Sequence, residues 1–222
     1  MTCDLKLSGG RVIDGSGTPA FPADVAISGD RIAAVGDLTA LEARETIACP
    51  GQIIAPGFID IHSHSDWLLP GADCAALVEP FVRQGMTTIV GGNCGFSPAP
   101  VSDRSREATQ SASRLIADDE IAIGWESMSE FLDGLEQTAL PLNVAELVGH
   151  GAVRAGVTGH LNSDAPGPEE LAEMERLTRA ALDAGCVGVE QIRVGYASDG
   201  HEEMGSLQRP LFSILPDCDG HA

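Results

Sequence analysis

The sequence predicts an α/β fold in which a small antiparallel β domain precedes a partial (β/α) barrel of about four units. Up to about residue 55, short alternating apolar runs are separated by turn residues, which is typical of antiparallel strands. From Gln52 onward, apolar strands alternate with helical segments, which indicates a parallel sheet with crossover helices. After this change about 165 residues remain, whereas a complete eight-unit barrel usually needs roughly 250. We therefore expect two domains, residues 1–55 and 56–222.

In the first domain, interpreted as the N-terminal part of a small β-sandwich, the apolar runs predict strands at 5–7, 24–27 and 45–47. Glycine and aspartate tolerate the positive φ that tight turns need. On that basis we expect turns at Gly9 and Gly10, at Gly15 to Gly17, and at Gly29 and Asp30. A helix across residues 25–35 would contradict this interpretation.

In the second domain, apolar runs predict parallel strands at 58–61, 87–90, 142–148 and 187–189. A first helix is expected to begin around Pro80, because proline suits the first turn. A second should begin after Ser127, whose hydroxyl and Glu130 match a capping box. A third is predicted over 168–184, with Gly185 as its stop. From about Gln191 onward the tail shows no periodicity, so we expect the chain to end before the barrel is complete.

The composition indicates a globular protein that avoids polyanions. Thirty-three acidic residues against 13 basic ones give a formal charge of −20, which disfavours nucleic acid and anionic membranes as partners. No apolar run approaches the roughly 18 residues of a membrane span, and no leader pattern is visible, so the expected location is the cytoplasm. The six cysteines show no close pairs and are interpreted as thiols.

The ends of the first two strands carry the residues that indicate chemistry. His62 and His64 follow the strand at 58–61 and are two residues apart, so that both imidazoles can meet one ion. Barrel enzymes place their catalytic groups at this end of a strand, and histidine nitrogen is a common zinc ligand. Cys94 follows the next strand among glycines, and thiolate also suits zinc. The sequence therefore predicts a Zn²⁺ site made of His62, His64 and Cys94.

Other polar residues leave two interpretations open. His150 follows the third strand and is either a site residue or a structural histidine, the second being favoured. Asp60 and Asp66 flank the histidines and are either outer partners that orient an imidazole or ordinary hydrogen-bonded loop carboxylates. His160 is expected to be solvated in a loop.

Several motifs resemble one enzyme family. PGFIDIHSHSD is similar to the first-strand signature of the amidohydrolase superfamily, and VRQGMTTIVGGNCGFSPAP is similar to a segment of its D-aminoacylase, or N-acyl-D-amino-acid deacylase, branch. LVGHGAVR and PEELAEMERLTRAALDAG also resemble that branch. The resemblance covers about residues 3 to 188. It implies a TIM-like barrel, a zinc ion held by His62, His64 and Cys94, and a metal-dependent hydrolase that cleaves the linear amide of a small N-acyl-D-amino acid into a carboxylate and a free D-amino acid.

The sequence also departs from that branch. Two further histidine ligands and the aspartate that acts as general base have no matching positions, and no role is assigned to His201 or His221. Glu190 and Gln191 stand where the family has a Ser/Thr-Gly motif, which suggests a truncation or a change of reading frame. The catalytic residues are therefore unknown, and we expect this form of the chain to be inactive. The acyl group, the substrate side chain, the number of metals and the oligomeric state stay open.

Two alternatives remain at this point. One is a cyclic amidohydrolase like hydantoinase or dihydroorotase, but many binuclear members bridge two metals with a barrel lysine, and the single lysine of this chain is Lys6 in the first domain. The other is a non-catalytic fragment, whose open sheet edges would favour pairing with other chains.

Overall fold

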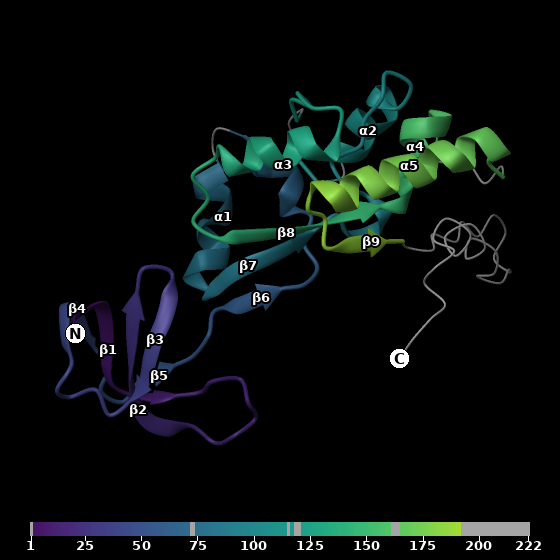
Figure 1. Cartoon of the computed structure of the whole chain (residues 1–222). Coiled ribbons are helices and arrows are strands. Elements are labelled where there is room, and N and C mark those ends of the chain that lie inside the picture. Colours follow the sequence, from purple (N-terminus) through teal and green to yellow (C-terminus); the bar gives the residue numbers. More distant parts are fainter. Residues whose placement is uncertain (1, 72–73, 115, 118–120, 161–164, 192–222) are drawn as a thin grey trace, which may run out of the picture. The chain divides into compact units, whose positions relative to one another are not determined.

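The computed structural model describes residues 2–71, 74–114, 116–117, 121–160 and 165–191. The chain divides between Gly57 and Phe58 into two compact units, which are described separately below (Figure 1). None of the helices in the described ranges combines the length and apolar character that crossing a bilayer requires.

The first unit is a five-stranded sheet. Its strands are β1 (Thr2–Val12), β2 (Phe21–Ser28), β3 (Arg31–Gly36), β4 (Glu42–Ala48) and β5 (Ile53–Ile54). The order is β3-β2-β1-β4, with β5 also paired to β1. The β1–β2 and β2–β3 pairs are antiparallel as expected, but β4 and β5 pair with β1 in parallel, so the expectation of a wholly antiparallel sheet was wrong. A local turn specifies the β2–β3 hairpin, whereas no local signal specifies the distant partner of β4. The β-sandwich stays a prediction.

Glycine serves two different purposes in this sheet. The turn at Gly29 and Asp30 joins β2 to β3 as predicted, and the helix that would have contradicted the strands does not form. No turn occurs at Gly9, because β1 continues through it with a register shift between Leu7 and Gly10. Gly9 has a φ of +76°, and its N–H donates to Asp24 Oδ1 at 2.8 Å. Positive φ at this position therefore forms a β-bulge inside a strand, which the sequence pattern alone does not distinguish from a turn.

The second unit contains a parallel four-stranded sheet in the order β6-β7-β8-β9. The strands are β6 (Phe58–Asp60), β7 (Met86–Gly91), β8 (Asn143–Gly149) and β9 (Gly188–Glu190). The helices are α1 (Cys74–Arg83), α2 (Arg106–Ser113), α3 (Met128–Glu136), α4 (His150–Thr158) and α5 (Pro168–Ala184), with 3₁₀ turns η1 (Ser65–Leu68) and η2 (Asn93–Gly95). This arrangement confirms the partial (β/α) barrel.

The helix predictions held where capping signals were clear. Ser127 caps α3 through a full capping box with Glu130, and α5 runs from Pro168 to Ala184 with Gly185 after it. The expected helix start at Pro80 was wrong, because Pro80 lies inside α1. The helices α2 and α4 were not predicted.

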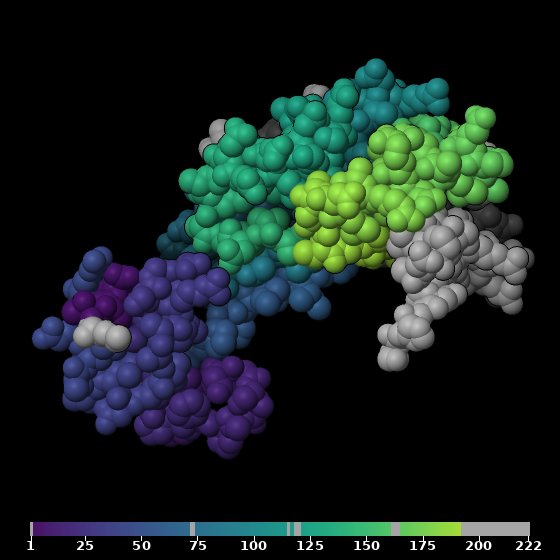
Figure 2. Space-filling model, in the orientation of Figure 1, coloured from purple at the N-terminus to yellow at the C-terminus, as the bar shows by residue number. Residues whose placement is uncertain are grey.

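The core of this unit lies between the sheet and its helices. Phe131 of α3 and Met174 of α5 are fully buried against Ile89 of β7 and Val148 of β8. Figure 1 shows the helices on one face of the sheet, and in Figure 2 the surfaces of α3 and α5 adjoin. On the edge strand β6, by contrast, Phe58 and Ile59 are largely exposed. The site residues thus lie at the carboxyl ends of a sheet whose one face packs against the helices.

Candidate metal centre

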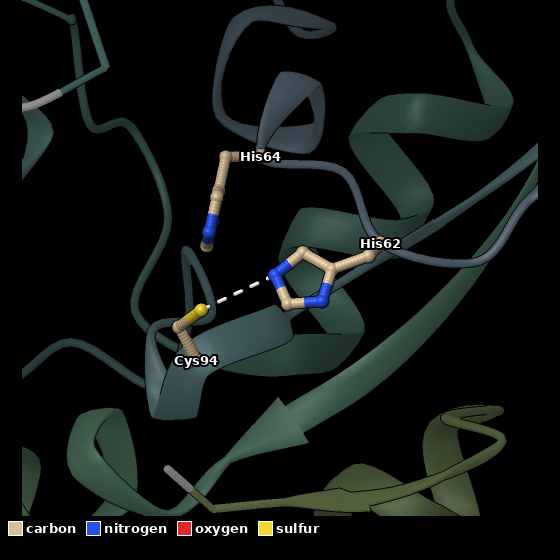
Figure 3. A group of neighbouring side chains, drawn as sticks. All are labelled: His62, His64 and Cys94. Carbon is tan, nitrogen blue, oxygen red and sulfur yellow. Dashed lines mark hydrogen bonds between the residues drawn. The ribbon is translucent and has the colours of Figure 1, made fainter. Parts of the chain in front are cut away.

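The three residues predicted as zinc ligands converge at the carboxyl ends of β6 and β7 (Figure 3). His62 and His64 lie between β6 and η1, and Cys94 lies in η2 directly after β7. Their possible ligand atoms all lie within 4.8 Å of one another, and His62 Nε2 is 3.2 Å from Cys94 Sγ. Parallel strands bring their carboxyl ends to the same edge, which is why Cys94 meets two histidines that lie 30 and 32 positions before it.

Hydrogen bonds hold the two ligand-bearing turns side by side. The Ser63 N–H donates to the Val90 carbonyl at 3.1 Å, and the Asn93 side chain donates to the carbonyls of Val90 at 2.7 Å and Ser63 at 3.4 Å. Asp60 Oδ1 accepts from the His62 N–H at 3.1 Å. Each turn is therefore fixed through its backbone, which leaves the imidazoles and the thiol free to face one another.

Cys94 adopts an unusual backbone conformation. With φ of 59° and ψ of 24°, it is the one non-glycine residue with positive φ among the residues that the structure describes. For a residue with a Cβ atom this left-handed conformation costs roughly 1 to 2 kcal/mol. The surrounding hydrogen bonds maintain it, and the result is a sulfur that points at the two imidazoles.

The local environment disfavours charge on the site in the absence of a metal. Burial lowers the pKa of His64, and the neighbouring His62 lowers it further, while Glu190 acts in the opposite direction. Burial raises the pKa of the Cys94 thiol, and the negative charge of Glu190 adds to this effect. A neutral imidazole is ready to ligate a metal, whereas the thiol would have to release its proton.

Glu190, to which the sequence assigned no role, ends β9 beside this site. Its carboxylate accepts a hydrogen bond from the Gly95 N–H, directly after Cys94. It is not one of the three residues whose ligand atoms converge. In the sequence, Glu190 stands out only as a departure from the family pattern.

The remaining polar candidates do not join the cluster. His150 is buried at the start of α4, and its Nε2 has no hydrogen-bond partner in the described part of the chain. Burial and then Arg154 lower the pKa of His150. The side chains of Asp60 and Asp66 accept hydrogen bonds from the backbone N–H groups of His62 and Gly92. His160 is exposed as expected. His201 and His221 lie outside the described residues.

A cavity of about 280 Å³ opens beside the cluster. It is lined by His64, Trp67, Cys94, Phe96, Ala112 and Ile116. Two of the three converging side chains thus border a mostly apolar space, in which a small molecule can lie against them.

Comparison with known proteins places this chain in a family. A D-aminoacylase from Alcaligenes xylosoxydans xylosoxydans is 40% identical over 187 residues, which cover 84% of this chain and 37% of that protein. A crystal structure of D-aminoacylase superposes with a TM-score of 0.75 at 38% identity, covering 85% of this chain and 38% of that one. No protein-family model matches the sequence.

The chain belongs to the D-aminoacylase family of amidohydrolases. It spans about 40% of the length of the curated relatives it matches, in their N-terminal part. A second family member, N-acyl-D-glutamate deacylase from Bordetella bronchiseptica, was solved with zinc and a phosphonate inhibitor. It superposes with a TM-score of 0.75 at 35% identity, covering 86% of this chain and 38% of that one.

Proposed function

We propose that the chain supplies zinc ligands to a hydrolase that cleaves N-acyl-D-amino acids into a carboxylate and a free D-amino acid. The observation that carries the proposal is the convergence of two imidazoles and one thiol within 4.8 Å. Membership of the D-aminoacylase family supports the reaction class, and the family member solved with zinc supports the metal.

The donor set fits zinc on chemical grounds. Zinc binds imidazole nitrogen and thiolate sulfur in tetrahedral sites, whereas magnesium and calcium prefer oxygen. The buried Nδ1 of His64 has no hydrogen-bond partner in the described residues, which is consistent with a ring reserved for an ion. A bound zinc would polarise the amide carbonyl and promote ionisation of water. The three side chains would hold the ion, and the adjacent cavity would receive an apolar group of the substrate.

We further propose that the 222-residue polypeptide, expressed by itself, does not turn over substrate. No general base has been assigned within the described residues, and general acid–base catalysis typically contributes about 100- to 10,000-fold in rate. His62, His64 and Cys94 would hold the ion, so metal binding can be tested apart from catalysis in this chain.

Zinc titration of the polypeptide and three variants tests the metal site. We expect His62→Ala and Cys94→Ala to weaken binding at least about 100-fold, because even outer partners contribute roughly 10- to 100-fold. His160→Ala is the matched control, since this exposed histidine lies outside the cluster. Unchanged affinity in His62→Ala and Cys94→Ala would contradict the site.

An assay for released D-amino acid from N-acetyl-D-amino acids, run with added zinc, tests the second part. We expect no turnover by the parent polypeptide. Turnover in the parent that disappears in both His62→Ala and Cys94→Ala would overturn the expected inactivity. It would indicate that a residue without an assigned role, such as Glu190, completes the site.

A further inference from the structure

Two buried acidic side chains lie directly behind the candidate metal centre. Asp66 follows His64 by two residues and is 0% exposed, and Glu146, in the middle of β8, is 2% exposed. A Cβ atom placed on Gly91 would lie within 3.0 Å of both side chains. The two carboxyl groups therefore meet over Gly91, in a space that exists because this residue has no side chain.

One of these carboxyl groups joins the two ligand-bearing turns. Asp66 Oδ2 accepts a hydrogen bond of 2.9 Å from the Gly92 N–H. Asp66 is two residues after His64, and Gly92 is two residues before Cys94. This hydrogen bond adds to those of Ser63 and Asn93 in tying the turn after β6 to the turn after β7.

Glu146 can donate a hydrogen bond to Asp66 only if its carboxyl group is protonated. Asp66 Oδ1 and both side-chain oxygens of Glu146 have no donor in the described part of the chain, and none of the ion pairs found there includes either residue. Two ionised carboxylates in contact would repel each other, whereas a proton on Glu146 makes the contact an O–H···O hydrogen bond. Burial, and then the charge of Asp66, raise the pKa of Glu146 well above its usual value.

We propose that Asp66 and Glu146 are positioning residues for the metal ligands. Neutral Glu146 donates to Asp66, and Asp66, fixed in this orientation, holds the turns of His64 and Cys94 at the spacing that one ion requires. The inference rests on the proposed metal centre and adds a role for two residues that do not touch the ion. Outer partners of this kind orient ligands and tune metal affinity.

Two substitutions at one position separate this role from simple packing. Glu146→Gln keeps a neutral donor of the same length, whereas Glu146→Met keeps a similar volume without a donor. The probe is Co²⁺ titrated into the 222-residue chain, followed by the thiolate-to-cobalt charge-transfer absorption, which reports the bond to Cys94 directly. Circular dichroism measures the fold of each variant.

We expect Glu146→Gln to bind Co²⁺ like the parent, with the same absorption. Glu146→Met should weaken binding roughly 10- to 100-fold and alter the charge-transfer band. A folded Glu146→Met with unchanged affinity and absorption would overturn the positioning role, because the pair would then serve packing alone. If Glu146→Met does not fold, Glu146→Gln decides, since weak Co²⁺ binding by a folded Gln variant would overturn the role of Glu146 as a neutral donor. Failure of the parent to bind Co²⁺ would instead overturn the metal centre, and this inference with it.

Discussion

Two polar clusters lie next to the turns after β6 and β7 but differ in their access to solvent. On the outer side, His62 is exposed, and His64 and Cys94 are half-buried. On the inner side, Asp66 and Glu146 are fully buried. Water can solvate the groups on the outer side when no ion is bound. The buried groups on the inner side must instead form hydrogen bonds with each other when the chain folds. The outer cluster therefore carries the proposed chemistry, and the inner cluster determines its geometry.

The largest effect should come from Gly92, which contributes to both clusters. It has a φ of +73°, and a Cβ atom there would overlap the Leu147 carbonyl of β8. We expect Gly92→Ala to lower the free energy of unfolding by more than about 4 kcal/mol and to abolish Co²⁺ binding. Urea unfolding and Co²⁺ titration measure these effects.

Gly85→Ala is the matched control for this substitution. Gly85 has a similar φ of +83°, but its Cβ would meet only the Phe58 ring, at 3.5 Å. The cost should stay near 1 to 2 kcal/mol, with Co²⁺ affinity retained. Equal losses in the two variants would mean that backbone strain, and not the contact with β8, decides the outcome.

The inner cluster should make stability depend on pH in a particular direction. Burial raises the pKa of Glu146 in the folded chain. Its proton therefore stabilises the fold fully below the unfolded pKa near 4.5, and this contribution is lost as pH rises toward the folded pKa. Relative to Glu146→Gln, the parent should lose roughly 1 kcal/mol for each pH unit between the unfolded and the folded pKa of Glu146. Urea unfolding of both proteins at pH 5 and pH 8 measures the difference.

Asp66 titrates together with Glu146, because burial raises its pKa to about 6, whereas the other groups nearby should not obscure this comparison. Burial, and then the charge of Glu146, raise the pKa of Cys186 to about 12, so its thiol stays neutral in this range. Burial lowers the pKa of His150, so this residue makes the fold less stable as pH falls, which is the opposite pH dependence. The effect is the same in both proteins. A pH-independent difference between parent and variant would contradict a raised Glu146 pKa.

The smallest effect on stability and metal binding is expected for a substitution remote from both clusters. Ser127 accepts the Glu130 N–H at 3.2 Å as the cap of α3. Ser127→Ala should cost about 1 kcal/mol of stability and leave Co²⁺ affinity unchanged. Ser129→Ala, on the exposed face of the same helix, should stay within about 0.5 kcal/mol of the parent. Changed metal affinity in Ser127→Ala would show that α3 influences the centre, and the contrast between local and remote positions would fail.

Sequence reasoning found the outer cluster because its signals are local. Histidines two residues apart after an apolar strand, and a cysteine among glycines after the next one, each belong to a strand end. Parallel pairing then brings these ends together. That these residues bind zinc stays a prediction.

The inner cluster was harder to predict from the sequence because it depends on a contact between two distant residues and not on a local motif. Glu146 interrupts the apolar strand NVAELVG. An acidic side chain within a strand that is buried on both faces requires a hydrogen-bond partner. Asp66 was left with two interpretations, and only the fold shows that it bonds Gly92. The parallel partner of β4 was missed for the same reason, because pairing between distant segments leaves no periodic trace.

The position of Trp67 gives the chain an optical reporter of its own. The indole is 2% exposed, its Nε1–H donates to the Phe96 carbonyl at 3.3 Å, and it lines the same cavity as His64 and Cys94. The second tryptophan, Trp125, instead donates to the Pro98 carbonyl at 2.8 Å and does not line that cavity. A paramagnetic ion held by the cluster should therefore quench the emission of Trp67, and Trp67→Phe should remove the response. Occupancy of the centre thus becomes visible by fluorescence without any attached label.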